Sequence, residues 1–159
     1  MDSQMISIES RLGQLKLIVT ELNSFLEAKL VIGGSWAMFL HGLEPLPTVK
    51  DEVDLVVSSN LSQKDRQTLA TLAAANPLYQ FNEKYGWLVK YQFIFKGWAI
   101  DIFEESVSEE TFFWYPKAFT NHSILVNPVN KIISARLKMG RKKDYLNIGK
   151  LITYILNLK

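Results

Sequence analysis

Apolar residues at the start of the chain recur every three or four positions, which is the spacing of one face of an α-helix. The pattern predicts an amphipathic helix over residues 4–28 that covers one face of a sheet. Its apolar positions are Met5, Ile8, Leu12, Leu15, Val19, Leu22 and Leu26. A β-branched run at residues 30–32 then ends at Gly33-Gly34, and Ser35 is placed to cap a helix that extends to about residue 41. The chain therefore opens with a helix, a strand, a tight turn and a second helix.

More strands are predicted where the pattern alternates or becomes rich in β-branched and aromatic residues. These segments are residues 52–57, 87–95, 98–103 and 123–126. The first alternates carboxylates with aliphatic residues before it becomes fully apolar, which predicts a strand that enters the core. The second and third meet at Lys96-Gly97 and predict an antiparallel hairpin. Ser62 begins a sequence that resembles a capping box and predicts a surface helix over residues 62–75.

The C-terminal third is predicted to be helical. Asn127-Pro128 is typical of a helix start with proline at the first helical position, and Gly140 divides two helices. We expect the apolar face of the last helix, about residues 141–158, to pack back on the domain. This face consists of Tyr145, Ile148, Leu151, Ile152 and Ile155.

The elements together predict one α/β (α+β) domain in which a mixed sheet of about four to five strands is flanked by helices. Its parts are an N-terminal helix (4–28), a core (30–126) and C-terminal helices (128–158). The length of 159 residues allows one core to form without disulfides or a structural metal.

Composition excludes some chemistries and leaves the partner open. The chain has no cysteine, so disulfides, thiolate zinc sites and a thiol nucleophile are excluded. No stretch reaches the roughly 20 apolar residues of a membrane span, and we expect a soluble, cytoplasmic protein with no membrane partner. The net charge of +2 does not by itself indicate nucleic acid.

Three carboxylates occupy positions where a core strand usually has aliphatic residues. Glu52 and Asp54 are two residues apart, so a strand sends both to one face. Burial of bare carboxylates is unfavourable, but Mg²⁺ removes their repulsion and prefers carboxylate oxygens together with substrate phosphates. Asp101 would supply a third carboxylate if its strand lies beside the pair. The alternatives are a solvated strand end for the pair and a water-facing edge strand for Asp101.

Groups that could bind phosphate occur at two other places. Gly33-Gly34-Ser35 leads from a strand into a helix, so backbone N–H groups and a hydroxyl could approach a phosphate there. An ordinary turn with a serine cap is the alternative. Five basic residues lie between Arg136 and Lys143 and could neutralise a triphosphate, or could form a solvated helix end beside Gly140.

In this order the elements resemble the minimal nucleotidyltransferases of the DNA polymerase β superfamily, and within them the abortive-infection toxin-like proteins. The resemblance covers about residues 30–151. The matching segments are Val31-Ile32-Gly33-Gly34-Ser35, Glu52-Val53-Asp54-Leu55, Ile100-Asp101-Ile102-Phe103, and Arg136 with Gly140-Arg141-Lys142-Lys143-Asp144.

The resemblance implies a polymerase β-like fold that transfers a nucleoside monophosphate from a nucleoside triphosphate, such as ATP, to an acceptor hydroxyl. It assigns nucleotide binding to Gly33, Gly34, Ser35, Arg136, Arg141 and Lys143, with Asp144 orienting the basic groups, and two Mg²⁺ ions to Glu52, Asp54 and Asp101. Asp101 would also orient or deprotonate the attacking hydroxyl. The acceptor stays open among RNA ends, a protein hydroxyl and a small molecule. The toxin-like relatives suggest a cognate antitoxin as a partner to test.

Several residues depart from the family pattern. Glu52 stands where aspartate is common, Thr48 and Lys50 replace the arginine and threonine that usually precede the acids, Asn147 replaces a second aspartate, and Trp36 follows Ser35. A second hypothesis is therefore a catalytically impaired nucleotide-binding or protein-interaction module with the same fold. A third is an RNA-binding protein that uses the C-terminal basic helix.

Overall fold

A computed structural model describes residues 3–48, 50–58, 60–73, 78–82, 86–105, 112–114 and 124–157. The predicted helix end at residues 74–75, strand start at residue 123 and helix end at residue 158 lie outside these ranges.

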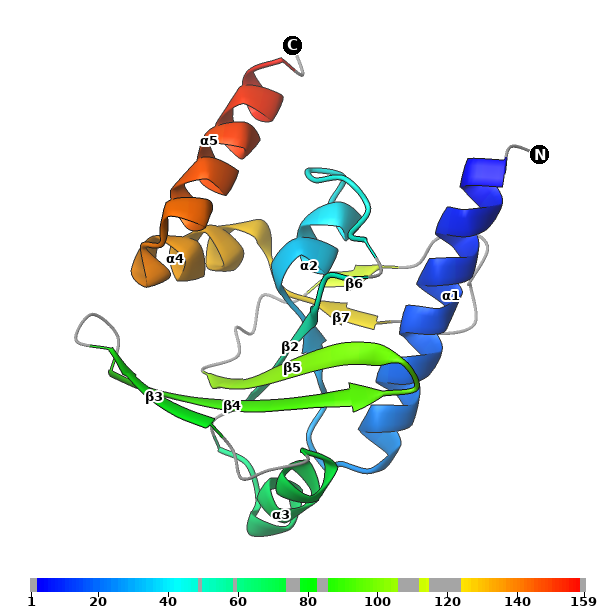
Figure 1. Ribbon diagram of the computed structural model, residues 1–159, viewed down its shortest axis with the longest axis vertical. Coiled ribbons are helices and arrows are strands. Elements are labelled where there is room, and N and C mark those ends of the chain that lie inside the picture. Colours follow the sequence, from blue (N-terminus) through cyan, green and yellow to red (C-terminus); the bar gives the residue numbers. More distant parts are fainter. Residues whose placement is uncertain are drawn as a thin grey trace.

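Among the described residues, a seven-stranded mixed sheet has the order β3-β4-β5-β2-β1-β7-β6 (Figure 1). The strands are β1 (Val31–Ile32), β2 (Val53–Ser58), β3 (Leu78–Asn82), β4 (Gly86–Phe95), β5 (Trp98–Glu105), β6 (Phe112–Trp114) and β7 (Ile124–Val126). β2 is parallel to β5 and antiparallel to β1, and β1 is parallel to β7. The predicted mixed sheet and the β4–β5 hairpin are confirmed, while β3 and β6 at the sheet edges are additional strands that the pattern did not predict.

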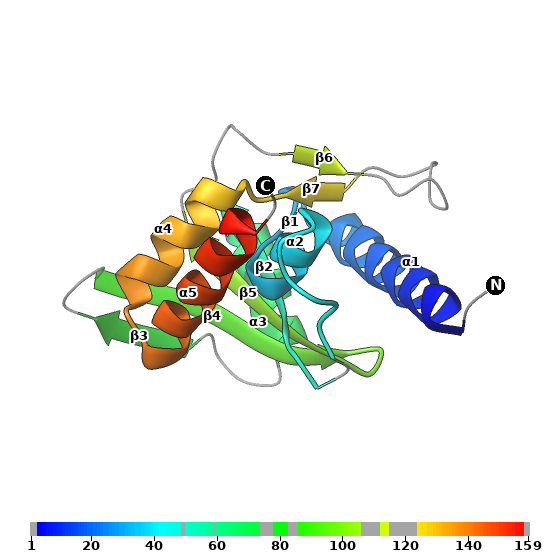
Figure 2. The same ribbon diagram turned by 90° about the horizontal axis from the view of Figure 1, so that it is seen from above.

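The helices flank this sheet as the sequence pattern predicts. They are α1 (Ser3–Ser24), α2 (Gly34–Leu40), α3 (Gln63–Leu72), α4 (Val129–Met139) and α5 (Lys142–Leu156). In Figure 1, α4 and α5 lie side by side above the sheet and α3 lies below it, and the view from above in Figure 2 shows the same pairing of α4 with α5. The two faces of the sheet are therefore covered by different helices.

Alternation along β2 separates the core from the polar face. Val53, Leu55 and Val57 are fully buried and belong to a core cluster with apolar residues of α1 and α3. Asp54 and Val56 point the other way and line a cavity that α4 also lines. The period of two in this strand thus decides which side chains stabilise the fold and which are available for chemistry.

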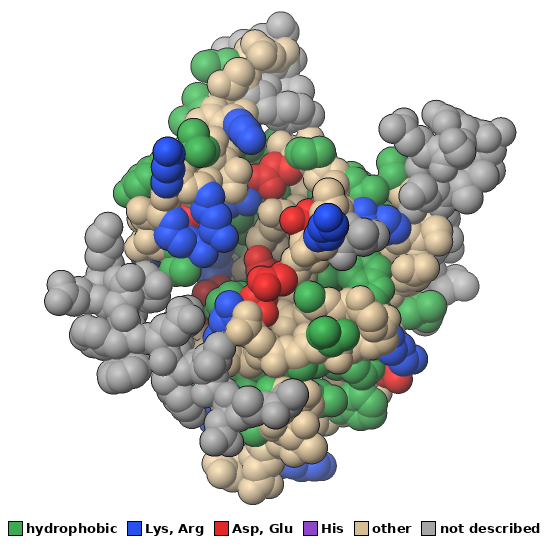
Figure 3. Space-filling view, viewed as in Figure 1, with side chains coloured by type: hydrophobic (Ala, Val, Ile, Leu, Met, Phe, Trp, Pro, Cys, Tyr) green, Lys and Arg blue, Asp and Glu red, His purple; other side chains and the backbone are tan. Residues whose placement is uncertain are grey.

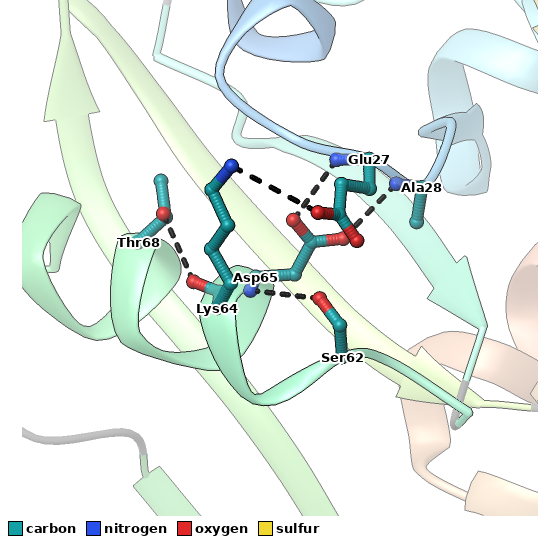
Figure 4. A network of polar contacts seen from close by, with 6 residues as sticks. All are labelled: Glu27, Ala28, Ser62, Lys64, Asp65 and Thr68. Carbon is teal, nitrogen blue, oxygen red and sulfur yellow. Dashed lines mark hydrogen bonds and ion pairs between the residues drawn. The ribbon is translucent and has the colours of Figure 1, made fainter.

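Asp65 joins the end of α1 to the start of α3 (Figure 4). Its buried carboxylate accepts hydrogen bonds from the backbone N–H groups of Glu27 (2.9 Å) and Ala28 (3.0 Å). Its own N–H donates to the Ser62 hydroxyl at 3.1 Å, which confirms Ser62 as the cap of α3. These contacts fix the path of the chain from α1 into β1.

Two other predicted helix starts are wrong, by two residues for α2 and by one residue for α4. Gly33, not Ser35, is the N-cap of α2, and no side chain caps this helix, because the chain becomes helical already at Gly34. Pro128 is the N-cap of α4 rather than its first helical residue.

The prediction that the apolar face of α5 packs back on the domain is wrong for most of that face. Leu151 is only 2% exposed, but Tyr145 and Ile152 are each 53% exposed and Ile155 is 45% exposed. The reason is that α5 packs against α4 and extends away from the sheet (Figure 1). Only the side of α5 that carries Leu151 is covered, and the rest of its apolar face is exposed to solvent. Neither α5 nor any other helix in the described part of the chain is both long and apolar enough to cross a membrane.

Candidate functional site

Three carboxylates meet where β2 and β5 run side by side. Asp54 and Asp101 are register partners on these parallel strands, and Glu52 lies just before β2, two residues from Asp54. Each residue offers one carboxylate oxygen, and these oxygens lie within 4.8 Å of one another. The predicted convergence is confirmed. Asp101 is 3% exposed on an interior strand, so the alternative of a water-facing edge position is wrong.

The proximity of the acids changes the ionisation of Glu52 and Asp54. A hydrogen bond that the protonated side chain of Glu52 donates to Asp101, together with burial and the negative charge of Asp101, raises the pKa of Glu52. Burial, followed by the charges of Asp101 and Glu52, raises the pKa of Asp54 to about 7. Such a cluster favours the binding of a proton or a cation, and carboxylate oxygens at this spacing fit a hard divalent ion.

A lysine from the neighbouring strand partly compensates this negative charge. The Nζ atom of Lys90 on β4 lies 3.1 Å from Oδ2 of Asp101, and both side chains are largely buried. Lys90 and Lys143 both favour the ionised forms of Glu52 and Asp54. Sequence analysis missed Lys90, although it shares a strand face with Gln92 between apolar neighbours, a polar pattern that could have indicated it.

The glycine turn lies directly against the acids. The N–H of Gly33 donates to the backbone oxygen of Asp54 at 2.9 Å. Gly34 has φ of +56°, and a Cβ atom at this position would lie 2.3 Å from Oδ2 of Asp54. Only glycine allows both the left-handed backbone and the close approach of the carboxylate. The predicted turn is thus part of the same site as the acid pair.

A cavity of about 380 Å³ joins the turn and Asp54 to the C-terminal helices. Predicted site residues among its lining are Gly33, Gly34, Ser35, Asp54, Arg136, Arg141, Lys143 and Asp144. Glu52 and Asp101 adjoin Asp54 but do not line the cavity. Figure 3 shows acidic side chains beside a central hollow, with basic side chains gathered over α4 and α5 across from them. The cavity therefore lies between groups of opposite charge.

The predicted basic residues differ in what they contact. Arg136 is largely buried and its guanidinium binds the carboxylate of Glu44 through two contacts, 2.7 Å and 3.3 Å long. Asp144 accepts from Nε of Arg141 at 2.7 Å and from Nη2 at 3.1 Å, so it orients Arg141, as expected. Arg136 ties α4 to the loop after α2, whereas Arg141 and Lys143 are exposed at the cavity.

The cavity also contains residues that the sequence pattern did not single out. Glu105 and Lys131 both line it, and burial raises the pKa of Glu105 and lowers the pKa of Lys131. Asn127, which the sequence marked only as part of a helix start, also lines it. No local pattern could place these residues together, because they come from β5, α4 and the end of β7.

Comparisons with known proteins support the fold. The sequence matches no protein-family profile and none of the curated proteins. The structure is similar to the crystal structure of "a putative nucleotidyltransferase" from Thermotoga maritima, with a TM-score of 0.59, 16% identity, and coverage of 91% of this chain and 93% of that chain. The chain therefore has a nucleotidyltransferase-like α+β fold over nearly its whole length. An identity this low shows the fold alone.

Proposed function

We propose that this protein is a Mg²⁺-dependent nucleotidyltransferase that transfers a nucleoside monophosphate from a nucleoside triphosphate to an acceptor hydroxyl. The observation that carries the proposal is the convergence of Glu52, Asp54 and Asp101 beside the Gly34 turn, at the edge of a cavity with a basic opposite wall. The likeness to the Thermotoga maritima protein supports the same kind of activity.

The donor set fits the expected metal. The three carboxylates would hold Mg²⁺, of which the polymerase β resemblance implies two ions, and the metal would neutralise charge on the phosphoryl group during transfer. The raised pKa of Asp54 fits this role, because the ionised cluster lacks sufficient positive charge from the protein itself.

The remaining residues have separate roles in the proposed reaction. The hydroxyl of Ser35 and the turn before it bind the phosphates, while Arg141 and Lys143 neutralise the leaving pyrophosphate. Asp101 accepts the proton of the acceptor hydroxyl. The acceptor oxygen bonds to the α-phosphorus as the bond from that phosphorus to the bridging oxygen of the β-phosphate breaks. Nucleotide binding by Arg136 stays a prediction, since Glu44 already occupies its guanidinium.

The test measures release of pyrophosphate from each nucleoside triphosphate with Mg²⁺, while RNA, protein and small-molecule acceptors are offered in turn. We expect Asp54→Asn to abolish turnover and metal-dependent triphosphate binding. Glu27→Gln, at an exposed carboxylate that belongs neither to the acid cluster nor to the cavity lining, should behave as the unmodified protein does. Full turnover in Asp54→Asn would remove this site from consideration.

One observation favours the alternative of a nucleotide-binding module without catalysis. Lys90 already pairs with Asp101, so the cluster has some positive charge even without a metal. This alternative predicts triphosphate binding that EDTA does not weaken and that releases no pyrophosphate. Metal-dependent binding with turnover would exclude it.

A further inference from the structure

Asn127 lies between β7 and α4, and its backbone is fully engaged. Its N–H donates to the oxygen of Ile32 at 2.9 Å, and its carbonyl oxygen lies 2.8 Å from Nε2 of His41. The residue is 3% exposed. These contacts hold Asn127 in one place without using its side chain.

The side-chain carbonyl oxygen of Asn127 is buried without a partner. Its Oδ1 atom has no hydrogen bond within the described part of the chain, and the residue lines the cavity. Buried polar atoms are nearly always hydrogen-bonded, and an unsatisfied acceptor destabilises the fold. A leucine or alanine would suit the fold better here, so the amide is better explained by a ligand than by stability.

Gly33 lies between this amide and the backbone of Asp54. Its backbone, with φ of −119°, is extended, so its conformation does not require glycine. A Cβ atom there would lie 3.4 Å from Val56, 3.6 Å from Nδ2 of Asn127 and 3.7 Å from the backbone oxygen of Asp54. A side chain at this position would therefore contact both the Asn127 amide and the Asp54 backbone.

The chemistry of the unpaired acceptor restricts the ligand group that meets it. Phosphate oxygens of a triphosphate accept hydrogen bonds and cannot satisfy a carbonyl oxygen. In a nucleotide, the available donors are the sugar hydroxyls and the amino or ring N–H groups of the bases. The sugar is attached directly to the α-phosphate. Asn127 is separated from Asp54 only by β1 and the residue that follows it, Gly33. A sugar hydroxyl is therefore the donor nearest to the reacting phosphate.

We propose that Asn127 accepts a hydrogen bond from a sugar hydroxyl of the bound nucleotide and so selects ribonucleotides over their deoxy analogues. This inference rests on the proposed function, because it places the α-phosphate at Asp54. A site that binds a hydroxyl rejects ligands that lack it, since its polar group then stays unpaired.

The experiment compares ATP, 2′-deoxy-ATP and 3′-deoxy-ATP, each with Mg²⁺, by calorimetric titration of the full chain. We expect the unmodified protein to bind ATP at least about tenfold more tightly than one of the two deoxy analogues. Asn127→Ala should lower ATP affinity to that of this analogue and abolish the difference. Asn130→Ala, an exposed asparagine three residues away, should keep it. Asn127→Leu keeps the cavity wall filled and serves as a second variant in case the smaller alanine impairs folding. It should also abolish the difference between ATP and the deoxy analogue.

Two readouts separate this role from others. Without nucleotide, Asn127→Leu should have an unchanged or higher melting temperature, whereas a structural role for the amide predicts a lower one. Equal affinity for all three nucleotides in the unmodified protein, or discrimination that survives in Asn127→Leu, would overturn the inference and leave the proposed function intact. A change in preference among ATP, GTP, CTP and UTP instead would assign Asn127 to the base. Absence of binding to any triphosphate would overturn both proposals.

Discussion

At the scale of single residues, the carboxyl group of Asp54 links the fold to the proposed metal. Its pKa in the folded protein is about 7, against an ordinary value of 3.8. Between these values the folded protein keeps a proton that the unfolded chain releases. The folded state then binds more protons, so stability falls as pH rises from about 4 to 7.

We therefore expect the free energy of unfolding, measured with urea and EDTA, to decrease across this pH window. Asp54→Asn should flatten the dependence, because the group that holds the extra proton is absent. Saturating Mg²⁺ should also remove the decrease in the unmodified protein, since the ion takes the place of the proton. If the free energy of unfolding depends on pH in the same way in the unmodified protein and in Asp54→Asn, the raised pKa of Asp54 is contradicted.

Gly34 provides a second test at this scale. Gly34→Ala forces a left-handed alanine, which costs about 1–2 kcal/mol, and places Cβ against the Asp54 carboxylate. Gly42→Ala has the same backbone strain at φ of +76° but no atom within 4 Å of the new Cβ. We expect a larger loss of stability by urea unfolding in Gly34→Ala than in Gly42→Ala, and loss of metal-dependent nucleotide binding only in Gly34→Ala. Equal binding in both variants would separate the turn from the acid site.

The sequence predicts some of these residues and not others for a physical reason. Glu52 and Asp54 could be placed on one face because strand geometry is local. Asp101 required the added assumption that its strand pairs with β2, which the register confirms. Lys90 and Asn127 reach the site only through tertiary pairing, so a local pattern can mark Lys90 as a polar strand residue but cannot place either residue beside the acids.

At the scale of elements, prediction succeeded where each segment carries its own signal. α1 and the β4–β5 hairpin have strong periodicity or a glycine turn, and both are present. β3 and β6 are short edge strands that pair with β4 and β7. Their formation depends on a neighbour more than on their own residues, because strand preference is context-dependent.

The periodicity of α5 reveals an apolar face but not which of its residues are covered. This can be tested with two substitutions on that face. Leu151 is buried and its neighbour Ile152 is largely exposed. We expect Leu151→Ala to destabilise the protein by about 2–4 kcal/mol and Ile152→Lys to change stability by less than about 0.5 kcal/mol. Urea unfolding of both variants checks this. A large loss in Ile152→Lys would mean that this face is covered in solution.

At the scale of the whole molecule, the site is assembled from segments far apart in the sequence. It is formed by the glycine turn, the end of the loop before β2, the middle of β5 and the α4–α5 junction. The hydrophobic and polar pattern predicts the order of these segments along the chain. The cavity arises only when α4 and α5 close over the polar face of the sheet, which no single segment determines.

A ligand that contacts both Asp54 and the basic residues of α5 must therefore stabilise the molecule as a whole. At a free concentration of 100 times its Kd, a nucleoside triphosphate with Mg²⁺ should raise the free energy of unfolding by about 2.7 kcal/mol. EDTA should remove this increase, and Asp54→Asn should lack it, while Ile152→Lys should keep it because its side chain lies outside the cavity lining. An equal increase with EDTA would place the nucleotide on the basic wall alone, and the acids would then have no part in binding it.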